Sequence, residues 1–248
     1  YLKGFSILKN YALLNNVDHQ DLRVITDHSA ELGDDMMYSV TFPAEFRNVQ
    51  AHYPILFFAD DGNNEMYPVA LFGFQQKENL FLTDKGWDAS YIPASVQREP
   101  FLIGTQAKQN DPSGEHQRMV SIDMDSPKLS KESGERLFEP LGGTTPYLER
   151  VANLLEGMHE GYAHGIDFML ALREHDLVES ITLEIELKDG SQNQLLGFST
   201  INEDKVKSLS GETLQMFSEK GYLAPLFMVV ASMASMEKLV DRKNASLN

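Results

Sequence analysis

The sequence predicts an α+β fold in which a mostly antiparallel sheet packs against C-terminal helices. Short apolar runs separated by turn signals dominate residues 22–125, whereas longer helical patterns dominate residues 144–243. A strand pair at 181–201 interrupts the helical half. Strands first, then a helix, a hairpin and more helices is an order typical of α+β proteins rather than of a βαβ parallel sheet.

The N-terminal half reads as a meander with one short helix. MMYSVTF (36–42) predicts a strand, and 43–52 predicts a short helix with a proline in its first turn. The apolar runs 53–60 and 66–74 flank the turn signal Asp-Gly-Asn-Asn, so they predict a β-hairpin. Further strands are predicted at 79–84, 100–106 and 118–125.

A long helix is predicted to begin at Thr145 and Pro146, because Thr is a good N-cap and Pro is tolerated in the first helical turn. An apolar stripe follows at three- and four-residue steps. Gly161 and Gly165 interrupt the pattern, so the sequence predicts either one bent helix or two consecutive helices. The stripe consists of Leu148, Val151, Leu154, Leu155 and Met158.

The C-terminal part is predicted to contain a hairpin and then helices. Residues 181–190 alternate between apolar and polar side chains, which indicates a half-buried strand, and 195–201 is its expected partner. A last helix is predicted over about 222–242. Its apolar run, 221–236, is shorter than the roughly 20 residues that span a bilayer and contains a proline. We therefore expect a buried helix and not an integral membrane protein.

The length of 248 residues allows one large domain or two small ones, and we expect a single globular domain over 1–248. Its strand-rich part is expected over 18–125, and its helix-rich part over 126–248 with the hairpin 181–201. The chain is 42% hydrophobic and 23% charged, and its formal net charge is −16. Such an acidic surface repels phosphates, so we expect no nucleic acid partner, and it suits solubility, a basic partner or a cation. The oligomeric state is left open.

The sequence contains no cysteine, which excludes disulfides, thiolate zinc sites and iron–sulfur clusters. No secretory signal is visible, so a cytoplasmic location is expected. Cell surface or periplasm is the alternative, since the sequence begins with Tyr rather than Met.

Catalytic and metal-binding motifs are incomplete. His159 and His164 are five residues apart, whereas the zinc protease motif needs two histidines four apart. There is no Gly-x-Ser-x-Gly and no Gly-x-Gly-x-x-Gly, and no cofactor is expected. His19 and Asp21 have the His-x-Asp spacing of a non-haem iron site, for which His52 is a candidate second histidine. This set is a weak alternative.

A long stretch resembles a known family. Residues 51–104 read AHYPILFFADDGNNEMYPVALFGFQQKENLFLTDKGWDASYIPASVQREPFLIG, and 134–149 read GERLFEPLGGTTPYLE. Both, with LGFSTINEDKVKSL (196–209), resemble the SapC family, from about Asp18 to Arg242. Glu99 departs from the family pattern, which has a tyrosine there. The resemblance implies a bacterial surface-layer, uptake or modification context and supplies no catalytic residue.

The candidate binding residues lie in and around this stretch, which holds the only tryptophan of the chain. Exposed Trp and Tyr side chains are common recognition anchors, although these rings could instead pack the meander onto a helix. We therefore expect a non-catalytic binding or accessory protein that recognises a peptide, glycan or partner protein. A metal-dependent enzyme and a structural surface-layer component are the alternatives. The candidate residues are His52, Tyr53, Trp87, Tyr91, Pro93 and Phe101.

Overall fold

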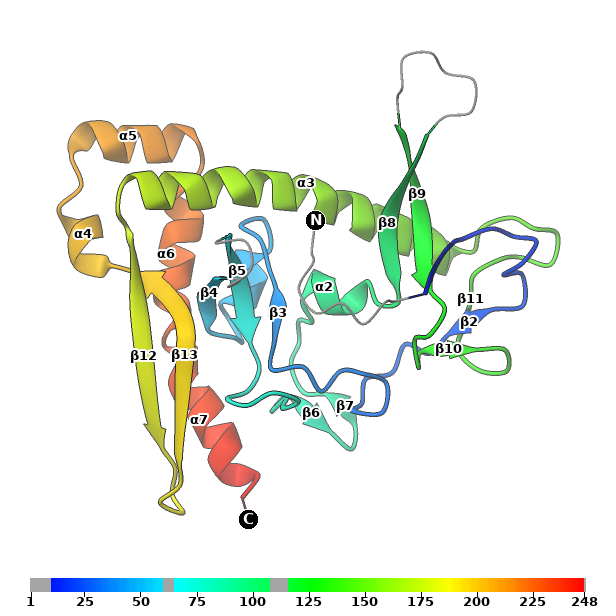
Figure 1. The fold of residues 1–248 in the computed structure, drawn as a ribbon, viewed down its shortest axis with the longest axis horizontal. Coiled ribbons are helices and arrows are strands. Elements are labelled where there is room, and N and C mark those ends of the chain that lie inside the picture. Colours follow the sequence, from blue (N-terminus) through cyan, green and yellow to red (C-terminus); the bar gives the residue numbers. More distant parts are fainter. Residues whose placement is uncertain (1–9, 60–64, 108–115, 248) are drawn as a thin grey trace.

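The computed structural model describes residues 10–59, 65–107 and 116–247 and has the predicted α+β architecture, with antiparallel sheets and C-terminal helices (Figure 1). Its largest sheet has the strand order β12-β13-β4-β5-β3, and every neighbouring pair is antiparallel. The strands are β3 (Tyr38–Val40), β4 (Ile55–Ala59), β5 (Met66–Leu71), β12 (Val178–Glu186) and β13 (Gln192–Ile201).

Both predicted hairpins are confirmed, and they share one sheet. In the first, β4 pairs with β5, with Ile55 opposite Ala70. In the second, β12 pairs with β13. The later hairpin joins the earlier one through Phe198, which lies opposite Phe58. Two hairpins that are far apart in the sequence therefore form one continuous sheet.

The predicted strands at 100–106 and 118–125 do not continue this sheet. They form β8 (Phe101–Ala107) and β9 (His116–Asp123), which pair with each other in a separate sheet, and β9 also pairs with β1 (Tyr11–Leu13). Alternation of side chains predicts that a segment is a strand, but it carries no information on which strand is its partner. Two smaller sheets consist of β10 (Leu129–Ser130), β2 (Arg23–Val24) and β11 (Glu135–Arg136), and of β6 (Leu82–Thr83) and β7 (Gly86–Trp87).

One unbroken helix, α3 (Pro146–Glu174), crosses the molecule (Figure 1). The Thr145 hydroxyl caps it by accepting a hydrogen bond from the Leu148 N–H. Gly161 does not break the helix but allows close packing, because a Cβ there would lie 2.3 Å from Cδ2 of Phe42. Of the two predicted alternatives, the structure has the single helix.

Helix α3 contributes to three clusters of buried side chains, the smallest of which joins its Met158 to Phe42 and Ala94. Its C-terminal half, with Phe168 and Leu172, packs into the core of the large sheet. Its N-terminal half packs against the β8–β9 sheet in a second core. The buried members of this second core are Leu22, Val24, Phe101, Ile122, Leu137, Phe138, Leu148, Val151 and Leu155.

The predicted last helix is divided into α6 (Leu223–Ser232) and α7 (Ser235–Ala245). One face is buried, as predicted, but Phe227 on the other face is 53% exposed. By length and composition alone, 223–245 is long and apolar enough to cross a membrane, and 33% of its most apolar window is buried. Core helices of soluble proteins pass the same test. The shorter helices are α1 (Phe46–Val49), α2 (Ala94–Gln97), α4 (Glu203–Lys207) and α5 (Gly211–Glu219).

Candidate functional site

The single tryptophan belongs to an aromatic cluster that packs on the large sheet, called here the Trp87 cluster: Tyr53, Phe72, Phe81 and Trp87. The ring centroids of Tyr53 and Phe81 are 4.6 Å apart, and those of Phe72 and Trp87 are 5.1 Å apart. The indole N–H donates to Oη of Tyr53 at 2.8 Å. Because the polar atom of the indole already has an internal partner, Trp87 acts mainly as a packing residue.

The hydrogen-bond chain continues into the segment that follows. Oη of Tyr53 donates to the Tyr91 carbonyl at 2.5 Å, and Oη of Tyr91 donates to Oε2 of Glu45 at 2.8 Å. Glu45 also accepts from the Ala94 N–H and the Thr41 hydroxyl. Burial raises the pKa of Glu45, although these hydrogen bonds oppose the shift. A buried carboxyl group thus anchors residues 91–94 to the start of α1.

The candidate binding residues divide by exposure. Tyr53 and Phe101 are 0% exposed and Pro93 is buried, so these three shape the fold beneath the surface and cannot touch a partner directly. Phe101 also lies in the second core, apart from the Trp87 cluster. His52, Trp87 and Tyr91 are partly exposed. Part of Trp87 lines a hollow of about 410 Å³ over the β6–β7 turn, with Thr83, Asp84, Lys85 and Asp88.

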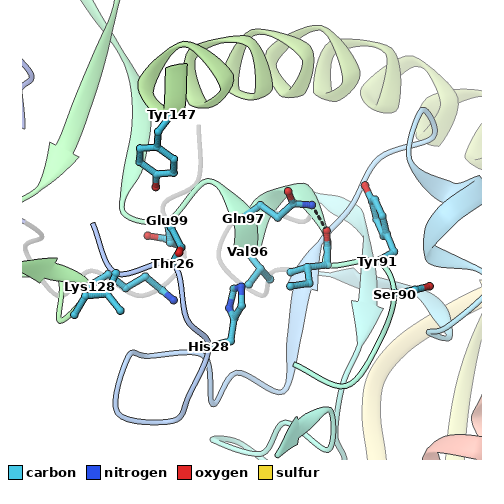
Figure 2. A pocket seen from close by; sticks show the side chains of 11 residues that line it. Thr26, His28, Ser90, Tyr91, Val96, Gln97, Glu99, Lys128 and Tyr147 are labelled. Atoms are coloured by element: carbon cyan, nitrogen blue, oxygen red, sulfur yellow. Dashed lines mark hydrogen bonds between the residues drawn. The ribbon is translucent and has the colours of Figure 1, made fainter. Parts of the chain in front are cut away.

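A second hollow, of about 390 Å³, lies beside the 90–99 segment and is called here the polar hollow (Figure 2). Tyr147 reaches toward it from α3, and His28 and Lys128 lie on the opposite side (Figure 2). This volume is within the usual range of small-ligand sites. The hollow is lined by Ile25, Thr26, His28, Ser90, Tyr91, Ile92, Val96, Gln97, Glu99, Lys128 and Tyr147.

A buried charge cluster supports one side of the polar hollow. Nζ of Lys128 lies 2.9 Å from Oδ2 of Asp34, which also contacts Nδ1 of His28 at 3.1 Å. Asp34 is 1% exposed and Lys128 4%. Burial of Asp34 opposes its ionisation, but hydrogen bonds from His28 and Lys128 and the charge of Lys128 outweigh it, so the pKa of Asp34 lies below its ordinary value. Nζ of Lys128 also donates to the Asp27 carbonyl at 3.1 Å, so a network of contacts holds this lysine in place.

Side chains on the other side of the hollow are also held by internal contacts. The Arg98 guanidinium lies 3.1 Å from Oε1 of Glu99. The Gln97 side-chain amide donates to the Ile92 carbonyl (Figure 2). Burial raises the pKa of Tyr147 to about 12, so its hydroxyl stays protonated at neutral pH.

Of the residues that line the polar hollow, the sequence-based candidates included only Tyr91. His28, Lys128 and Tyr147 come from distant parts of the chain and share no motif. Glu99, the position where a departure from the resembled family pattern was expected, also lines the hollow.

His52 and Ser90 form a contact that resembles a base with its nucleophile. Nε2 of His52 lies 2.8 Å from Oγ of Ser90. Partial burial lowers the pKa of His52, as do the charges of Lys238 and Arg242. Ser90 is among the residues that line the polar hollow, whereas His52 is not.

The candidate iron ligands His19, Asp21 and His52 do not form a metal site in the structure. Nδ1 of His19 accepts a hydrogen bond from the Asn15 N–H at 3.1 Å, Asp21 is exposed, and His52 contacts Ser90. Within residues 10–59, 65–107 and 116–247, no group of three His, Asp or Glu side chains could hold a metal ion.

Comparison with known proteins gives one informative result. The family model described as SapC matches residues 14–239, which is most of the chain. No curated protein matches the sequence, and no solved structure matches the fold.

Proposed function

The chain belongs to the SapC family, and we propose that it is a binding or accessory protein that holds a ligand in the polar hollow. The bacterial surface, uptake or modification setting rests on the family resemblance. A glycan, a peptide or a segment of a partner protein are the candidate ligands.

The observation that carries this proposal is the construction of the polar hollow. Its lining comes from several segments that are far apart in the sequence, and hydrogen bonds or ion pairs fix the side chains of Gln97, Glu99 and Lys128. Side chains that are already held in place lose little entropy when a ligand binds. Charged groups locked in ion pairs are better suited to holding a ligand than to exchanging protons with it.

A thermal-shift screen tests this proposal. The purified chain is heated with neutral saccharides, uronic acids and short peptides, each at millimolar concentration. A ligand at a hundred times its Kd stabilises the folded state by about 2.7 kcal/mol, which raises the Tm by several degrees. We expect at least one class of compound to produce such a shift.

A matched pair of variants ties the shift to the hollow. Thr26 is exposed and lines the hollow, so Thr26→Trp fills it without disturbing the core. Thr182 is exposed on β12, and Thr182→Trp is the control. We expect Thr26→Trp to abolish the shift and Thr182→Trp to keep it. A shift that survives Thr26→Trp, or no shift with any compound, would overturn the proposal.

A further inference from the structure

The charges at the polar hollow are balanced internally. Lys128 is paired with Asp34 at 2.9 Å, and Glu99 with Arg98 at 3.1 Å. A charged ligand would need a counter-charge as it loses water, because a desolvated charge without a partner is costly. Binding it would require one of these ion pairs to break. The charge balance therefore favours a ligand without net charge, even though the chain as a whole is strongly acidic.

The remaining lining is a mixture of apolar and uncharged polar groups. Ile25 and Ile92 are partly exposed and offer apolar contact. Thr26 and Tyr147 carry hydroxyls, which both donate and accept hydrogen bonds. The fitting ligand presents hydroxyls and C–H surface together, which is the chemistry of a neutral sugar.

An uncharged peptide fits less well. Peptides are commonly bound as an added strand at a sheet edge or as a polyproline segment in an aromatic-lined groove. None of the residues that line the polar hollow belongs to a strand, so it offers no sheet edge for a peptide. The lining instead consists of loop residues, α2 and the first turn of α3.

We propose that the polar hollow binds a short neutral saccharide, whose hydroxyls bond Thr26, Gln97 and Tyr147 while its C–H face contacts Ile25 and Ile92. This inference rests on the proposed function and names the ligand class of the same site. The hydroxyl of Tyr147, which comes from α3, points toward the hollow in Figure 2. From there it would hydrogen-bond a sugar hydroxyl.

Saturation-transfer NMR with defined probes tests the class of ligand. The probes are glucose, galactose, mannose, N-acetylglucosamine and their disaccharides, with galacturonic and glucuronic acids as charged counterparts and an uncharged peptide, capped trialanine. We expect at least one neutral saccharide to bind. Its uronic acid counterpart should bind at least tenfold more weakly.

Two conservative variants locate the contact. Tyr147→Phe removes one hydroxyl and keeps the ring, so we expect it to weaken saccharide binding about fivefold or more. Tyr222→Phe, in the large core, should leave binding unchanged. Equal loss in both variants would mean that the site is elsewhere.

The outcomes separate this inference from the proposed function. If a uronic acid or the peptide binds instead, and Thr26→Trp abolishes that binding, the saccharide inference fails and the proposed function stands. If no probe of any class binds, both fail. Saccharide binding that is lost in Thr26→Trp and weakened in Tyr147→Phe supports both.

Discussion

The Trp87 cluster and the polar hollow are neighbours, since the ring centroid of His28 at the hollow lies 5.5 Å from that of Trp87, yet their side chains have different roles. In the Trp87 cluster, aromatic rings contact one another and the indole N–H bonds an internal hydroxyl. At the polar hollow, fixed polar side chains surround an open volume of about 390 Å³. The comparison teaches that one conspicuous stretch of the sequence serves both regions. Its Trp87 end packs inward, while residues of the 90–99 segment line the candidate site together with residues from distant segments.

The largest expected effect comes from removing the charge that supports the hollow. Lys128→Met leaves the Asp34 carboxylate buried without its lysine, and breaking a buried pair in this way costs about 3–5 kcal/mol. Urea unfolding at neutral pH measures the loss. Lys85→Met, at an exposed lysine, is the control and should change the free energy of unfolding by less than about 0.5 kcal/mol. A small loss for Lys128→Met would mean that Asp34 finds another partner or takes up a proton.

The next effect concerns the Trp87 cluster. Tyr53→Phe keeps the ring but leaves the Trp87 N–H and the Tyr91 carbonyl without their hydroxyl partner, which costs about 1–3 kcal/mol. Tyr222→Phe, whose hydroxyl lies outside this network, is the control. If both variants are equally stable in urea unfolding, the indole is not held by Tyr53 and a recognition role for Trp87 regains weight.

A pH effect separates the two carboxyl groups that support these regions. The folded pKa of Glu45 is raised above its value in the unfolded chain, so its contribution to stability is complete below about pH 4.5 and is lost as the pH rises through the folded pKa. The pKa of Asp34 is lowered, so its contribution is present above about pH 4 and is lost as the pH falls through the folded pKa.

Unfolding of Glu45→Gln and Asp34→Asn across the pH range checks these signs. The stability advantage of the unmodified chain over Glu45→Gln should shrink as the pH rises above 4.5. Its advantage over Asp34→Asn should shrink as the pH falls below about 4. Two curves with the same slope would contradict the opposite environments of the two groups.

Local patterns in the sequence predicted the elements well but not their assembly. The Thr145 cap, the hairpin of β4 and β5, and the alternation of β12 follow from neighbouring residues. The division of the core into separate clusters does not, since it depends on which strands pair. The polar hollow could not be predicted for the same reason. His28 and Lys128 both contact Asp34, and folding is what brings these three residues together.

The smallest expected effect on stability is the most informative for function. Tyr147→Phe keeps the ring contact with Phe101, at a centroid distance of 6.3 Å, and removes a hydroxyl that points toward the hollow (Figure 2). We expect the free energy of unfolding to change by less than about 0.5 kcal/mol, in contrast to Tyr53→Phe. Urea unfolding of the two variants side by side makes the measurement. A loss above 1 kcal/mol for Tyr147→Phe would show that its hydroxyl stabilises the fold, and the hollow would then resemble the Trp87 cluster rather than a site kept free for a ligand.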